Sequence, residues 1–80
     1  MNEALSHAQL EFADEVIVYC RGISDADARD YAVEYARMIA NRANGIETLM
    51  PTAPHGLFEP HRKLIRSTLQ RMGEKHFREA

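Results

Sequence analysis

The stretch that decides the fold is SDADARDYAVEYARMIANRANG, residues 24–45. Its apolar residues recur at steps of three and four, which keeps one side of a helix facing a core. Ser24 is suited to cap the start of such a helix, and Gly45 is suited to end it. The pattern therefore predicts a helix over residues 25–43.

Two kinds of side chain share the apolar side of this helix. Alanine recurs at every fourth position from Ala28 to Ala40, so a neighbouring helix can approach that edge closely. Tyrosine and methionine, which are enriched at protein interfaces, lie beside the alanines. The predicted interaction residues are Tyr31, Tyr35, Ala36 and Met38. The alternative left open is that these side chains fill the core of the single chain.

A first helix is predicted over residues 2–21, where apolar side chains again fall at helical spacing. Its run Val16-Ile17-Val18-Tyr19 is also compatible with a buried strand, but no partner strand is near in the sequence. Gly22 follows at the position where a helix commonly ends in a left-handed turn.

A third helix is predicted over residues 60–73 or beyond, with Pro60 in its first turn and Gly73 weakening its end. The connector before it, residues 45–58, is interrupted by proline and glycine. Within the connector, Ile46 to Met50 is a candidate for a short strand.

These elements predict a single all-α domain over residues 1–80, a small three-helix domain. A chain of 80 residues has a marginal core, which rarely contributes more than about 3–5 kcal/mol. Its one cysteine excludes an internal disulfide. We therefore expect a homodimer, in which a second copy completes a helical bundle.

Composition narrows the class of protein further. The chain is 45% hydrophobic and 28% charged, with a net charge of −2, which is typical of a globular domain. No apolar run approaches the roughly 20 residues of a membrane span, and the N-terminus lacks the pattern of a signal peptide. The expectation is a cytoplasmic protein that does not bind membranes.

Charge is divided unevenly along the chain. Residues 1–55 carry four basic and nine acidic side chains, whereas residues 56–80 carry six basic and three acidic ones. The basic C-terminal helix is a candidate for binding nucleic-acid phosphates, whose affinity depends on the number of neutralised charges. The candidate contact residues are Arg62, Lys63, Arg66 and Arg71. The competing interpretation is a solvated surface that balances the acidic half.

The residues that most often carry chemistry are scattered. His7 falls at helical spacing with Glu3 and Glu11, but structural zinc sites require four ligands and usually include thiolates. His55 and His61 flank the end of the connector without a second pair, and Cys20 ends an apolar run. A thiol in apolar surroundings has a raised pKa and behaves as a small hydrophobe. We therefore predict no catalytic residues, no metal and no cofactor.

The function favoured by this reasoning is a non-enzymatic protein-interaction or regulatory module that presents a helical surface. The alternative is a nucleic-acid-associated transcriptional regulator that uses the basic C-terminal helix. A third hypothesis, a small metal-dependent enzyme built on the histidines, is the weakest. The identity of the protein partner is beyond what the sequence indicates.

Overall fold

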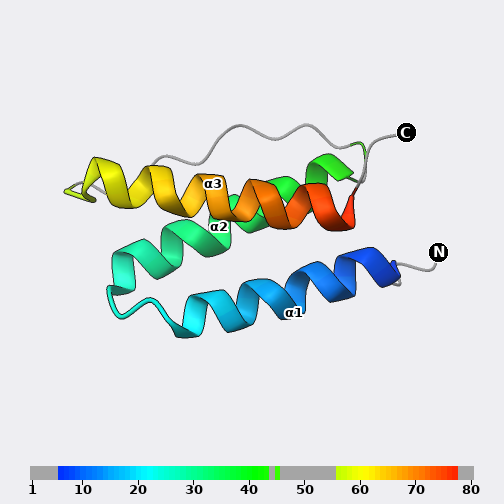
Figure 1. Cartoon of the computed structure of the whole chain (residues 1–80), viewed down its shortest axis with the longest axis horizontal. Coiled ribbons are helices and arrows are strands. Elements are labelled where there is room, and N and C mark those ends of the chain that lie inside the picture. Colours follow the sequence, from blue (N-terminus) through cyan, green and yellow to red (C-terminus); the bar gives the residue numbers. More distant parts are fainter. Residues whose placement is uncertain (1–5, 44, 46–55, 78–80) are drawn as a thin grey trace.

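Three helices form the part of the chain that a computed structural model describes, residues 6–43, 45 and 56–77. They are α1 (His7–Arg21), α2 (Ala26–Ala43) and α3 (Glu59–His76). Figure 1 shows α2 and α3 running in the same direction, with α1 running opposite to both. Because the described residues contain helices and no strand, the predicted all-α, three-helix class is confirmed.

Helix α1 begins at His7, later than the predicted start at residue 2. Ser6 has extended backbone (φ −69°, ψ 162°), and its hydroxyl oxygen accepts from the Gln9 backbone N–H at 3.1 Å. The Gln9 side-chain oxygen accepts in turn from the Ser6 N–H at 2.9 Å, which completes a capping box. The helix ends at Arg21 as predicted, but Gly22 is right-handed (φ −84°), so the predicted left-handed turn is wrong.

Helix α2 is capped by Asp25, so the prediction of Ser24 as its cap is wrong. One Asp25 carboxylate oxygen accepts from the backbone N–H groups of Asp27 at 2.9 Å and Ala28 at 3.2 Å. The helix accordingly begins at Ala26. After its last turn, Gly45 has a φ of +82°, a conformation that favours glycine, and its N–H donates to the Arg42 carbonyl.

Helix α3 begins at Glu59, has Pro60 in its first turn, and continues through Gly73 to His76. The prediction of residues 60–73 or beyond placed this helix correctly and left its end open. The connector shows a left-handed Gly56 at φ +92°. The candidate strand from Ile46 to Met50 lies outside the described residues.

The core lies where the three helices meet. Tyr35 of α2 and Ile65 and Leu69 of α3 are the largest fully buried side chains, and Phe12 of α1 joins the same cluster. Full burial of a side chain the size of Leu69 stabilises the fold by about 1.5–3 kcal/mol. Phe12 also packs edge-on against Phe77, with ring centroids 5.1 Å apart. These contacts hold α3 against both of the other helices.

Close packing of α2 on α3 depends on Gly73. A Cβ atom added at Gly73 would lie 2.7 Å from Cγ2 of Ile39, too close for any side chain unless α2 or α3 moves. Cγ2 is fixed to the branched Cβ of isoleucine, whose χ1 is restricted in a helix. The glycine, which weakens an isolated helix, is therefore required by the contact between helices.

None of the helices in the described segments has both the length and the hydropathy required to cross a membrane.

The cap of α2 generates the first prediction. Asp25→Ala removes the acceptor for two N–H groups and should lower the free energy of unfolding by about 1 kcal/mol. Ser24→Ala, one residue earlier, should change it by less than about 0.5 kcal/mol. Urea unfolding followed by circular dichroism measures both variants. A larger loss for Ser24→Ala would contradict the assignment of the cap.

The contact at Gly73 generates the second prediction. Gly73→Ala gains about 1 kcal/mol of helix propensity but overpacks against Ile39 at a cost of about 1–3 kcal/mol, so the net effect should be destabilising. In an Ile39→Ala background the same change should stabilise the chain by up to about 1 kcal/mol. Equal effects of Gly73→Ala in the two backgrounds, measured by urea unfolding, would show that the helices do not pack closely at this point.

Candidate functional site

All four predicted interaction residues belong to the buried core. Tyr31, Tyr35 and Met38 are buried, with at most 6% of each residue exposed. The Gln70 side-chain amide donates to the Tyr35 hydroxyl at 3.1 Å, which satisfies that polar group and ties α3 to α2. Ala36 is also buried, but it lines an open groove between α1 and α2. Of the four residues, Ala36 is therefore the one that borders an open surface.

Tyr31 lies close to the basic residues of α3. Burial raises the pKa of its hydroxyl, and the guanidinium groups of Arg66 and Arg62 act in the opposite direction. Arg62 also forms an ion pair with Glu59, one turn earlier in α3. Two of the four candidate nucleic-acid contacts therefore interact with groups of the same chain.

The other two candidates, Lys63 and Arg71, are exposed. At about 100° of helix rotation per residue, the four basic positions spread over about 180° of the α3 circumference. They do not converge on one side of the helix. No feature of the described residues favours the nucleic-acid hypothesis over the solvated surface.

The described histidines fall into two regions, because His7 and His76 both pair with Glu11 of α1, whereas His61 lies apart from them. His7 pairs with Glu11 at 2.9 Å on the exposed side of α1. His61 lies in the first turns of α3, whereas His55 and Glu3 lie outside the described residues. Within residues 6–43, 45 and 56–77, no three histidine, cysteine or acidic side chains are arranged to hold a metal ion.

His76 is the histidine that sequence reasoning did not single out. Its side chain is only 6% exposed, and it lies between two carboxylates of α1: Nδ1 is 3.4 Å from Glu11 and Nε2 is 3.2 Å from Glu15. Lys75 adds a 2.8 Å ion pair to the same Glu15 oxygen. Hydrogen bonds from Lys75 and His76 lower the pKa of the Glu15 carboxyl. This cluster joins the first half and the middle of α1 to the end of α3.

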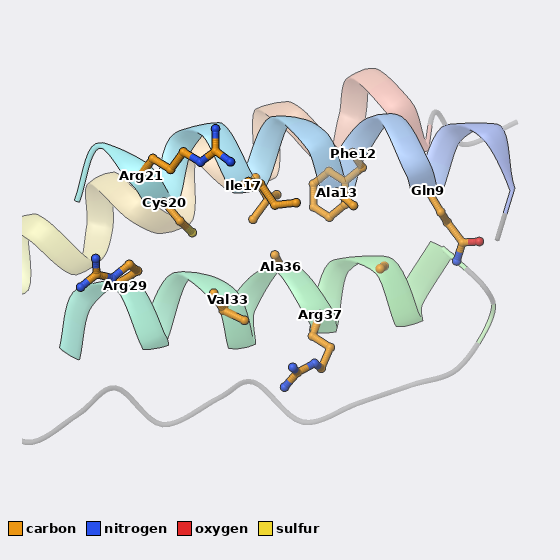
Figure 2. A pocket seen from close by; sticks show the side chains of 12 residues that line it. Gln9, Phe12, Ala13, Ile17, Cys20, Arg21, Arg29, Val33, Ala36 and Arg37 are labelled. Atoms are coloured by element: carbon orange, nitrogen blue, oxygen red, sulfur yellow. The ribbon is translucent and has the colours of Figure 1, made fainter. Parts of the chain in front are cut away.

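A groove between α1 and α2 holds about 510 Å³ (Figure 2). Its walls are almost entirely apolar. From α1 they include Phe12, Ala13, Val16, Ile17 and Cys20, and from α2 they include Val33, Ala36 and Ala40. Because α3 packs elsewhere on α1 and α2, no helix of the described chain covers the groove.

Large apolar side chains border this groove in contact with solvent. Ile17 of α1 is 50% exposed and Val33 of α2 is 38% exposed. Leu10 of α1, also 50% exposed, falls two turns before Ile17 on the same side of the helix. Single exposed apolar residues are ordinary, whereas these side chains flank a contiguous apolar groove.

One end of the groove is basic. Figure 2 shows Arg21 and Arg29 on either side of Cys20 at the same end of the groove. Neither arginine has an ionic partner among the described residues, whereas Arg37 donates to Glu34 at 2.7 Å. An occupant with an acidic group at this end would complement the charge.

Cys20 lies on the floor of the groove. Burial raises the pKa of its thiol, and the charge of Arg29 partly opposes this effect. Because the thiolate is the nucleophilic form, a raised pKa disfavours a catalytic role.

Sequence reasoning identified Ala36 but missed the groove as a whole. The signal was present in α1, where Leu10, Ala13 and Ile17 recur at helical spacing on a side other than that of Phe12 and Val16. The sequence alone did not reveal that α3 leaves this second stripe uncovered.

Comparison with known proteins gives no relative, because no family model, curated protein or solved structure matches the chain.

The cluster around Glu15 generates a pH prediction. The pKa of Glu15 is lower in the folded chain than its ordinary value of 4.5, so its ion pairs add stability above about pH 4.5. That stability should be lost as the pH falls through the lower folded pKa. Glu15→Gln should therefore flatten the acid side of a plot of unfolding free energy against pH.

Glu74→Gln is the matched control, because Glu74 is exposed on α3 and has no ionic partner among the described residues. This variant should keep the same dependence of unfolding free energy on pH, on the acid side, as the unaltered chain. If Glu15→Gln and Glu74→Gln give the same slope, the cluster does not contribute to the pH dependence.

Proposed function

We propose that this chain is a non-enzymatic interaction module that binds an amphipathic helix in the groove between α1 and α2. The observation that carries the proposal is the apolar groove itself, walled by two helices and left uncovered by the third. A helix placed there would pack against two others, which is the usual arrangement of a helical bundle.

The shape and lining of the groove favour a helix as its occupant. Helix-in-groove recognition places an apolar helical stripe into a hydrophobic groove. Ala36 and Ala40 on α2 and Ala13 on α1 keep the walls low, so a helix backbone can approach closely. The larger Ile17 and Val33 stand at the rim, where they would cover the sides of a bound helix.

Photo-crosslinking tests this proposal in the cells that make the protein. A benzophenone amino acid placed at Val33, on the rim of the groove, should form covalent adducts with whatever occupies it. The control position is Ser67, which is exposed on α3 and does not line the groove. Adducts at Val33 and not at Ser67 are expected. Equal labelling at both positions, or none at Val33, would contradict the proposal.

A further inference from the structure

We propose that the helix bound in the groove is α1 of a second copy of this chain, in an antiparallel dimer with twofold symmetry. This inference rests on the proposed function and names the partner that the groove receives. In such a dimer each α1 is both a wall of its own groove and the occupant of the other groove.

Helix α1 has the apolar stripe that the groove requires. Leu10, Ala13 and Ile17 fall within about 60° of one another around the helix, at about 100° per residue. This stripe adjoins the groove lining, since Ala13 and Ile17 belong to both. Half of Leu10 and half of Ile17 are exposed in the single chain, and a bound copy would remove that apolar surface from water.

The charges along the same helix are complementary between two antiparallel copies. Asp14 and Arg21 border the stripe on its solvent side, and neither has an ionic partner within the described residues. Asp14 precedes Ile17 by about 4.5 Å along the helix axis, and Arg21 follows it by about 6 Å, at 1.5 Å per residue. An antiparallel pair of α1 helices that cross at Ile17 therefore places each Asp14 beside Arg21 of the other copy.

The twofold axis makes the charge pattern self-complementary. One contact between Asp14 and Arg21 implies a second, identical contact on the other side of the axis. A foreign acidic helix would complement Arg21 and Arg29 but would leave Asp14 facing further acidic groups. A second copy supplies an opposite charge to both Asp14 and Arg21, which is why we favour it over an unrelated acidic partner.

The small size of the chain also favours dimerisation. A domain of 80 residues has a small core, and the uncovered groove leaves part of its apolar surface in contact with water. Dimerisation through the groove restores that burial without a disulfide or a metal.

A charge-reversal series tests the dimer. Asp14→Arg should leave two basic residues facing each other at both ends of the contact, and Arg21→Asp should leave two acidic ones. Each variant should raise the dimer dissociation constant at least tenfold, measured by sedimentation equilibrium against a monomer mass of 9.1 kDa. The double variant Asp14→Arg/Arg21→Asp should return to within about threefold of the unaltered chain, since the opposite charges are paired again.

Mixing adds a test in trans. Equimolar Asp14→Arg and Arg21→Asp chains should form a heterodimer with opposite charges at both ends, at concentrations where each alone is monomeric. Circular dichroism of each variant monitors helix content, and both substituted positions are exposed. Glu74→Arg, which makes the same change in net charge on α3, should leave the dissociation constant unchanged.

The results that overturn the inference are distinct from those that overturn the proposed function. A mass that stays at 9.1 kDa at high micromolar concentration, or single variants that dimerise as well as the unaltered chain, overturns the dimer. If Val33 crosslinks to a different protein and never to a second copy of this chain, the dimer is overturned and the helix-binding groove is supported. Adducts at twice the chain mass support both the helix-binding groove and the dimer. The absence of any adduct contradicts both proposals.

Discussion

The rest of the structure depends on one feature of α2, which carries bulky side chains on the side that faces the core and small ones on the side that faces the groove. Its bulky residues, Tyr31, Tyr35 and Met38, are buried in the core, and Gln70 of α3 bonds the Tyr35 hydroxyl. Its small residues, Ala36 and Ala40, form one wall of the groove shared with α1. A helix with large side chains on one side and methyl groups on the other packs fully against one neighbour and leaves a low wall beside the second. The groove is a direct consequence.

The contacts between the other helices follow from this arrangement. Gly73 lets α3 approach Ile39 closely, and Ile65 and Leu69 fill the space around Tyr35. Helix α1 is held near its middle by Phe12 against Phe77 and by Glu15 against Lys75 and His76. Those contacts lie on the α3 side of α1. The opposite side of α1, with Leu10 and Ile17, is left facing solvent.

Helical periodicity was sufficient to predict the three helices, because each carries a sustained apolar stripe. The starts of α1 and α2 differ from the prediction. The Ser6–Gln9 capping box of α1 was overlooked, and Ser24 rather than Asp25 was predicted as the cap of α2, because both residues are able to cap a helix and only the backbone geometry selects between them. The role of Gly73 could not be inferred, because its effect comes from Ile39, which is remote in sequence. Similarly, the groove depends on where α3 packs, which no local pattern in α1 or α2 specifies.

If α1 of a second copy fills this apolar groove, the thiol of Cys20 on its floor reports that occupancy directly. As the only cysteine of the chain, it gives an unambiguous signal. The measurement is the rate at which a thiol reagent modifies Cys20 as the protein concentration is raised. The rate should fall as a second copy fills the groove, and Ile17→Asp should abolish the fall. A rate that is independent of concentration, with or without Ile17→Asp, would contradict occupancy of the groove by a second copy.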